Sequence, residues 1–227
     1  MTRAGNQTYD GPDDLPAVIP VFPLAGTLLL PRRALPLNVF EPRYLAMVDA
    51  ALAGDRLIGL IQPAVGRPGT ERANRPPLER VGCLGRLTQY AETGDGRLIV
   101  TLTGVARFAV TEELATTTPY RQVRYETESF ADDFRPGVGE EAVDRAKLLA
   151  TLRAYLDHNA LAVEWSQFES AANEALVDGL AMMSPCGPRE KQALLEAPDL
   201  NTRSELLVAI TERSLAAGEG GGPGPLQ

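Results

Sequence analysis

Ile19-Pro-Val-Phe-Pro-Leu24 and Leu35-Pro-Leu-Asn-Val-Phe-Glu-Pro-Arg-Tyr44 are the two ends of one apolar, proline-punctuated run that decides the fold of this chain. Proline cannot donate a hydrogen bond to a sheet, so it is confined to strand starts, edges and bulges. Five prolines cut the run into short β-rich pieces: Pro20, Pro23, Pro31, Pro36 and Pro42. Such short pieces must bend sharply, which predicts a coiled, barrel-like β unit rather than a flat sheet.

The pattern of the chain changes near residue 130. Residues 1–16 are polar and are interpreted as a flexible leader. Residues 17–130 are rich in short apolar runs separated by turn signals. Helical spacing of apolar residues then predicts a helical bundle over 131–217, and the Gly- and Pro-rich segment 218–227 is expected to be disordered. We therefore expect an α+β protein, with a β pseudo-barrel and one early helix followed by a helical bundle.

Local patterns in the β-rich part predict a hairpin and an irregular strand. Thr93-Gly-Asp-Gly96 lies between two β-rich runs and is a strong hairpin signal. The strand after it alternates apolar and polar residues, but Ile99 breaks the alternation. Gly104 interrupts the same strand, which indicates a bulge or a close approach of another backbone segment.

One longer helix is predicted in the helical half. Ser166-Gln-Phe-Glu169 fits a capping box, in which side chains accept or donate the hydrogen bonds that the first helical turn leaves open. Apolar residues follow on one stripe from Phe168 to Met183, and Pro185 ends the pattern. The sequence therefore predicts a single helix across this stretch.

The net charge of −8 is unevenly distributed along the 227 residues. Residues 17–130 hold 13 Arg and 11 acidic residues (+2), residues 131–227 hold 8 basic and 16 acidic residues (−8), and residues 1–16 account for the remaining −2. This acidity argues against tight nucleic-acid binding, which needs a basic face that displaces counterions. A local basic patch remains an alternative, because five arginines lie close together in the sequence: Arg67, Arg72, Arg75, Arg80 and Arg86.

Recognisable catalytic arrangements are missing from the sequence. A lone His158 excludes an HExxH motif or a multi-histidine metal site, and neither a P-loop nor a GxSxG elbow is present. Lys147 and Lys191 fall in helices expected to be exposed, whereas a lysine base needs desolvation. We therefore expect a protein that is not an enzyme, with no catalytic residue, no metal and no cofactor.

Membrane insertion and export are not indicated either. No apolar stretch approaches the length needed to span a bilayer, and the N-terminus lacks the apolar core of a secretory signal. The two cysteines, Cys83 and Cys186, are far apart and form no CxxC pair. The expected location is the cytoplasm.

The proline-punctuated run resembles the N-terminal, substrate-binding domain of the Lon protease family. Further matches follow in order: Val81-Gly-Cys83, Thr103-Gly-Val-Ala-Arg-Phe108, Pro119-Tyr-Arg121 and Pro188-Arg-Glu-Lys-Gln-Ala-Leu-Leu-Glu196. The resemblance covers roughly residues 17–215 and implies a PUA-like pseudo-barrel followed by a helical bundle. Full-length Lon proteases continue into an ATPase module and a peptidase, for which this chain has neither the motifs nor the length. It is thus expected to resemble stand-alone proteins made of the Lon N-terminal domain.

Five residues are candidates for polypeptide binding: Phe40, Glu41, Arg43, Tyr44 and Arg107. Arg43 lies in a first helical turn, where the helix dipole disfavours a cation, so we expect it to have a specific partner, either Glu41 or an acid from another strand. One interpretation is a strand-to-helix corner clamped by an ion pair with Tyr44 packed beneath it. The other is a groove in which Arg43 and Tyr44 bind peptide backbone or an acidic group. Arg107 could point inward at Glu41 or outward at a ligand.

Three functional hypotheses follow for the chain. The first is a non-catalytic polypeptide-recognition module, an adaptor that binds unfolded or tagged polypeptides and works with a protease or chaperone, using an exposed sheet edge. The second is a PUA-like RNA-binding protein that uses the arginine cluster, although the overall acidity disfavours nucleic acid. The third is a small-molecule sensor or hydrolase with a pocket in the barrel. No membrane partner is expected.

Overall fold

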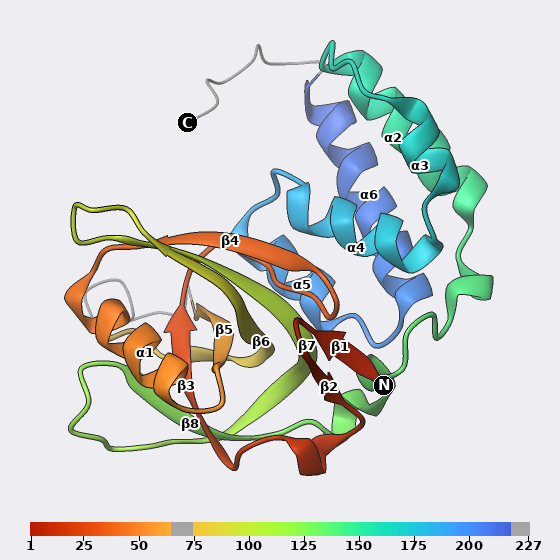
Figure 1. Cartoon of the computed structure of the whole chain (residues 1–227). Helices are drawn as coiled ribbons and strands as arrows, with labels where there is room; N and C mark the ends of the chain where they lie inside the picture. The colour runs from red at the N-terminus through yellow and green to blue at the C-terminus, as the bar shows by residue number, and fades with distance from the viewer. Residues whose placement is uncertain (65–74, 219–227) are drawn as a thin grey trace. The chain divides into compact units, whose positions relative to one another are not determined.

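The proline-punctuated run forms strands and a helix of a barrel, as predicted. The computed structural model describes residues 1–64 and 75–218. Six strands form one sheet in the order β4-β7-β6-β5-β3-β8, and a further pairing of β7 with β8 closes it into a barrel (Figure 1). Their bounds are β3 Val18–Pro23, β4 Ala34–Val39, β5 Leu57–Pro63, β6 Leu78–Glu92, β7 Leu98–Glu113 and β8 Arg121–Glu126.

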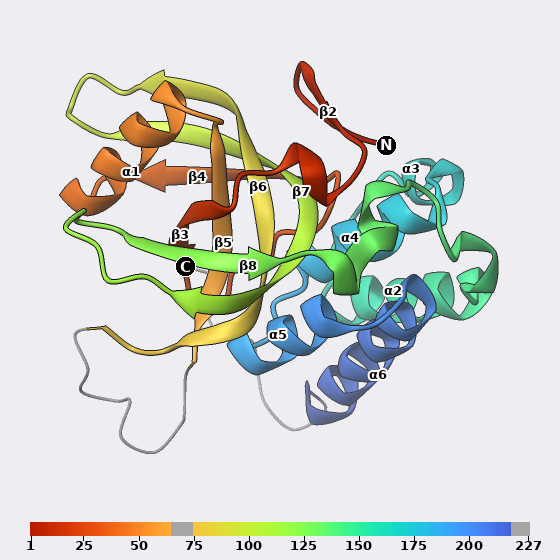
Figure 2. The same ribbon diagram turned by 90° about the horizontal axis from the view of Figure 1, so that it is seen from below.

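Strand pairing in the barrel is antiparallel except between β3 and β5. Figure 2 shows β8, β3, β5 and β6 following one another around the barrel. Strand β7 is shared, because Leu98–Thr103 pair with β4 while Ala109–Glu113 pair with β8. Strand β4 therefore lies outside the closed ring and is an edge strand within the part of the chain that is described.

The prolines lie where each strand lacks a neighbour on one side. Pro20 pairs with Gln122 of β8 in the part of β3 that has no partner in β5, and Pro23 pairs with Ile61 of β5 beyond the end of β8. Pro36 lies in the edge strand β4. Pro42 is the first residue of helix α1, Pro42–Ala53, where its missing N–H costs no hydrogen bond. The proline spacing thus encodes the edges of the barrel.

Phe108 is the centre of the barrel core. Its ring is fully buried and meets Tyr125 edge-on at 5.6 Å between ring centroids. Gly82 on β6 makes room for it, because a Cβ atom there would lie 2.5 Å from Phe108 Cζ and 2.7 Å from the carbonyl oxygen of Leu60. The barrel interior is therefore filled by side chains, with glycines where the largest ring meets neighbouring strands.

The first residues form a hairpin rather than a flexible leader. Strand β1, Thr2–Ala4, pairs with β2, Gln7–Tyr9, and the 3-10 helix Pro12–Asp14 follows. Ala4 and Tyr9 are buried in the barrel core cluster. The expectation of a leader over 1–16 is wrong because half of the side chains of a two-stranded ribbon face solvent, which makes its composition polar. The expected disordered segment 218–227 lies, apart from Gly218, outside the described residues.

The chain divides into two compact units, and the division is not a single boundary near residue 130. Unit 1 comprises Met1–Pro136 together with Gly187–Glu196, and unit 2 comprises Gly137–Cys186 and the segment that begins at Ala197. Helix α5, Pro188–Glu196, which the sequence places in the helical bundle, thus belongs to the barrel unit.

Gln62 of β5 fixes helix α5 to the barrel. Its side-chain nitrogen donates to the carbonyl oxygen of Pro188 at 2.9 Å and to Gln192 Oε1 at 3.1 Å. Gln192 in turn donates to the carbonyl oxygen of Val81 on β6 at 3.1 Å. Buried amides that are satisfied in this way determine the position of the helix as well as its burial.

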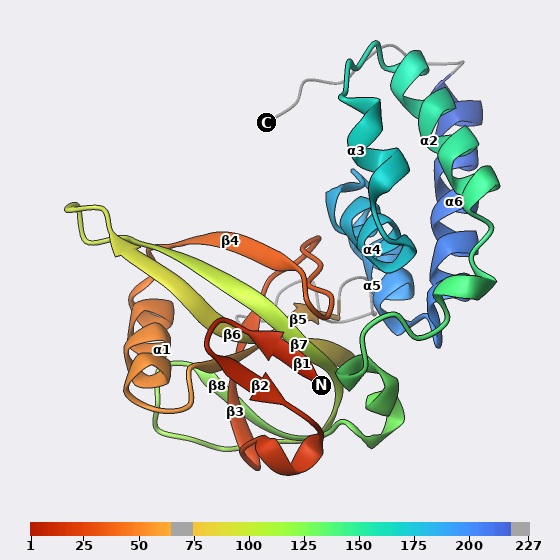
Figure 3. The same cartoon turned by 45° about the vertical axis from the view of Figure 1, so that its right-hand side comes forward.

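Unit 2 is helical, with α2 running alongside α6 (Figure 3). Its elements are the 3-10 helix Glu140–Ala142, α2 Arg145–His158, α3 Trp165–Ser170, α4 Asn173–Met183 and α6 Leu200–Gly218. The single helix predicted across Phe168 to Met183 is wrong: α3 ends at Ser170, Ala171 and Ala172 are extended, and Ser166 lies inside α3 without acting as a cap. Arg203 of α6 donates to Asp178 Oδ1 of α4 at 2.8 Å, and both side chains are buried.

The structure has both features expected at Gly104, a bulge and a close approach of another backbone segment. The pairing of β6 with β7 shifts by one residue between Ala106 and Gly104, which is a bulge. The backbone of residues 30–33 also approaches closely: the Gly104 N–H donates to Arg33 O at 2.9 Å and the Arg32 N–H donates to Gly104 O at 2.8 Å. A Cβ atom at residue 104 would lie 2.0 Å from Leu30 O.

We predict that Gly104→Ala lowers the free energy of unfolding by about 3 kcal/mol or more, because the clash is with backbone atoms that cannot rotate away. Gly11→Ala is the matched control, since Gly11 is extended with φ of −177° and a Cβ there meets no atom within 4 Å. Urea unfolding followed by circular dichroism measures both variants. Equal stability of the two would show that the close approach at Gly104 is absent in solution.

Candidate functional site

The corner between β4 and α1 brings together four of the five predicted residues. Phe40 follows β4, Glu41 precedes the first helical residue, and Arg43 and Tyr44 lie in the first turn of α1. Arg43 Nε donates to Glu41 Oε2 at 2.9 Å, and Arg43 Nη2 lies 2.8 Å from the same oxygen. The expected partner of Arg43 is therefore confirmed as Glu41. Both side chains are about half exposed, so the pair contributes at most about 1 kcal/mol to stability.

Tyr44 belongs to the core beneath this corner. Its ring packs on Phe22 of β3 with centroids 4.2 Å apart, and the guanidinium of Arg43 lies 4.4 Å from the Tyr44 ring centroid. Burial raises the pKa of the Tyr44 hydroxyl, and the positive charge of Arg43 opposes that rise. Of the two interpretations of the corner, the geometry matches the clamped corner, in which Tyr44 supports the fold and leaves little surface for a ligand.

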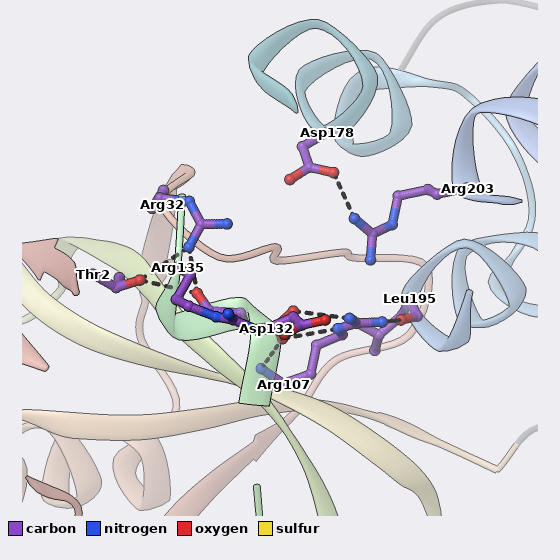
Figure 4. Close-up of polar contacts among 9 residues, drawn as sticks. Thr2, Arg32, Arg107, Asp132, Arg135, Asp178, Leu195 and Arg203 are labelled. Atoms are coloured by element: carbon purple, nitrogen blue, oxygen red, sulfur yellow. Dashed lines mark hydrogen bonds and ion pairs between the residues drawn. The ribbon is translucent and has the colours of Figure 1, made fainter. Parts of the chain in front are cut away.

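Arg107 is not part of this corner. Its side chain is buried and ion-paired with Asp133 of the 3-10 helix Glu128–Phe134 (Figure 4). Nε donates to Asp133 Oδ2 at 2.9 Å, Nη2 to Asp133 Oδ1 at 2.8 Å, and Nη1 to the carbonyl oxygen of Leu195 in α5 at 3.1 Å. The guanidinium also lies over the ring of Phe130, 4.7 Å from its centroid. Neither predicted direction, toward Glu41 or toward a ligand, is correct.

The outer face of β4, β7 and β6 carries an exposed apolar patch that the sequence analysis did not assign. Asn38, Ile99 and Ala91 are in register across the three strands, so their side chains share one face. Phe40 directly follows β4, two residues beyond Asn38. Phe40 is 58% exposed and Ile99 49% exposed.

Arg97 borders the same face. Its guanidinium lies 5.9 Å from the centroid of the Phe40 ring and 3.3 Å from Asp95 Oδ2 in the hairpin turn. The hydrogen bond from the Thr93 hydroxyl lowers the pKa of Asp95, which keeps that carboxylate charged. We call the exposed surface made by these residues the ribbon face: Pro36, Asn38, Phe40, Ala91, Arg97 and Ile99. Its sequence signal was the break that Ile99 makes in the alternation of β7.

Two of the three described members of the arginine cluster, Arg75 and Arg86, bond within the protein, and the third, Arg80, is exposed. Arg75 and Arg121 both bond to Glu113, whose pKa is lowered chiefly by the hydrogen bond from Arg121. Arg86 donates to the Tyr9 hydroxyl at 3.1 Å and to the carbonyl oxygen of Asp55 at 2.8 Å. Arg67 and Arg72 lie outside the described residues. Within the described residues, Arg75 and Arg86 are thus engaged by partners inside the protein.

Comparison with known proteins places most of the chain in one family. The family described as the ATP-dependent protease La (LON) substrate-binding domain matches residues 18–213. The Lon protease of Anaeromyxobacter dehalogenans is 28% identical over 205 residues, which are 88% of this chain and 24% of that protein. Lon protease 2 of Myxococcus xanthus is 27% identical over 202 residues, with 88% and 24% covered. The chain thus spans about a quarter of the length of these relatives.

Two solved structures share the fold. The N-terminal domain of a Mycobacterium avium complex Lon protease matches with a TM-score of 0.62 at 19% identity, over 86% of this chain and 98% of that one. The Lon N-terminal domain protein from Xanthomonas campestris matches with a TM-score of 0.53 at 24% identity, over 85% and 97%. These likenesses confirm the α+β architecture inferred from the sequence. Among the described residues, no helix is both long and apolar enough to cross a bilayer.

We predict that Arg107→Met lowers the free energy of unfolding by about 3–5 kcal/mol, because it leaves the buried carboxylate of Asp133 without its cation. Arg124→Met is the matched control: its ion pair with Glu112 is exposed at 54% and 61%, so its loss should cost no more than about 1 kcal/mol. Urea unfolding at neutral pH compares the two. A loss at Arg107 no larger than that at Arg124 would contradict a structural role for the buried pair.

Proposed function

Because this chain belongs to the family of ATP-dependent protease La (LON) substrate-binding domains, we propose that it binds unfolded or tagged polypeptides without changing them chemically. The ribbon face is the proposed contact surface. The observation that supports this proposal is the exposure of Phe40, which directly follows β4, and of Ile99 on β7. Exposed apolar patches of this kind mark interaction surfaces, and an unfolded chain presents apolar side chains that such a patch can cover.

Side-chain contacts, rather than added strand pairing, should dominate this binding. Strand β4 is an edge strand in the described part of the molecule and could in principle accept an additional strand. Pro36 in its middle has no N–H to donate, and edge prolines discourage strand addition. Binding through Phe40 and Ile99 needs no fixed hydrogen-bond register, so many different sequences can be accommodated with modest affinity.

The wider role that we propose is that of an adaptor. The curated relatives that match are proteases about four times as long as the matching region. A domain that holds polypeptides without cutting them would act with a protease or chaperone. Mass spectrometry of the proteins that co-purify with this chain tests the idea: repeated recovery of one protease or chaperone is expected, and recovery of neither would contradict the adaptor role.

We predict that the double variant Phe40→Ser, Ile99→Ser binds an unfolded polypeptide at least about tenfold more weakly than the unaltered protein, which corresponds to about 1.4 kcal/mol. Fluorescence anisotropy with a labelled, reduced and carboxymethylated protein gives the Kd. Both side chains are largely exposed, so circular dichroism and the unfolding midpoint should change little.

Met183→Ser is the matched control for this experiment. Met183 is 80% exposed at the end of α4 in unit 2, so the variant removes an exposed apolar side chain that is not part of the ribbon face. Its Kd should equal that of the unaltered protein. The same loss of binding in both variants, or in neither, would show that the ribbon face is not the contact surface.

A further inference from the structure

A small pocket lies at the opposite end of helix α1 from Phe40. It has a volume of about 160 Å³ and is bordered by the start of β3, the last turn of α1 and the start of β8. Its lining includes Pro16, Val18, Pro20, Ala50, Asp55 and Gln122. Pockets for drug-sized ligands have volumes of about 300–1,000 Å³. This pocket is therefore the right size for a single amino-acid side chain.

The walls of the pocket are mixed, with apolar and polar surface in similar shares. Pro16, Val18 and Pro20 come from one extended segment, and Ala50 faces them from α1. Strand β3 is held here by pairing with β8, where Val18 lies opposite Arg124 and Pro20 opposite Gln122. The pocket thus lies where two barrel strands and a helix meet the turn that carries Asp55.

The rim of the pocket carries one acidic side chain, that of Asp55. Asp55 is exposed, and within the described part of the chain its carboxylate forms no ion pair; Arg86 bonds to the carbonyl oxygen of Asp55 instead. The C-terminal end of α1 also borders the pocket, and its carbonyl groups carry the negative end of the helix dipole. Both arginines of β8 are ion-paired, Arg121 with Glu113 at 2.5 Å and Arg124 with Glu112 at 3.4 Å.

We propose that this pocket binds one basic side chain, Lys or Arg, of a polypeptide held by the protein. The methylene stem of such a side chain would cover the apolar walls, and its charged head would lie at the rim beside Asp55. An uncharged apolar side chain would fill the same volume but leave the carboxylate without a partner. The inference rests on the proposed function, because it takes the ligand to be a polypeptide.

Two pentapeptides test the pocket directly: acetyl-Gly-Gly-Lys-Gly-Gly-amide and the same peptide with norleucine, which keeps the stem and lacks the charge. Titration of the 15N-labelled protein, followed by NMR, gives both the affinity and the location of binding. The lysine peptide should bind about fivefold or more tightly than the norleucine peptide, as expected for one solvent-screened charge pair. Shift changes should be confined to residues 16–20, 50–57 and 120–122.

Asp55→Asn should abolish the difference between the two peptides, whereas Asp49→Asn should retain it. Asp49 is an exposed acid of the same helix that does not line the pocket, so the control removes an equal charge nearby. Ala50→Phe, which fills the pocket, should lower the affinity for both peptides to the same extent. Equal binding of the two peptides, shift changes elsewhere, or no effect of Asp55→Asn would overturn the proposal.

Lysine acetylation of the unfolded polypeptide separates this inference from the proposed function. Acetylation removes the positive charge and keeps the chain unfolded. If the pocket binds basic side chains, the unaltered protein should bind the acetylated polypeptide more weakly than the unacetylated one. The Asp55→Asn variant should bind the two polypeptides with equal affinity. Equal binding of both polypeptides to the unaltered protein would refute the pocket alone. Absence of binding by either polypeptide would refute polypeptide recognition itself.

Discussion

The buried ion pair between Arg107 and Asp133 is the interaction on which the rest of unit 1 depends. A carboxylate taken out of water must be surrounded by donors, and Asp133 receives three hydrogen bonds from Arg107, one of them from its backbone N–H. The carbonyl oxygen of Asp133 also accepts from the Thr2 hydroxyl and from Arg32 (Figure 4). Arg107 itself reaches the carbonyl oxygen of Leu195. One pair therefore joins the N-terminal hairpin, the barrel and helix α5.

Much of the barrel could be predicted because its determinants are local. Each proline acts through its own missing N–H, so Pro36 in an edge strand and Pro42 at a helix start follow from the residue alone. Gly104 likewise indicates that another backbone segment approaches the strand closely, although the sequence does not identify that segment. The clamp of Arg43 on Glu41 was predictable for the same reason, since its two partners are two residues apart.

The missed features depend on contacts between residues far apart in the chain. Gln62 and Gln192 are separated by 130 positions, and nothing in either residue indicates the other. Arg107 and Asp133 are 26 positions apart, and neither residue indicates the other in the sequence. For the proposed contact surface, the sequence carries one signal, the break that Ile99 makes in the alternation of β7. The proposed pocket beside Asp55 has no such signal, because it forms only where separate segments of the chain meet.

Helix α5 also constrains the order in which the parts of this protein can fold during translation. Domains usually fold as they leave the ribosome, beginning at the N-terminus. Here all strands of the barrel emerge first, then residues 137–186 of the other unit, and only then the helix that supplies Gln192 and the Leu195 carbonyl group. A nascent barrel must therefore wait with Gln62 and Arg107 incompletely bonded. Synthesis thus makes completion of the first unit depend on translation of much of the second.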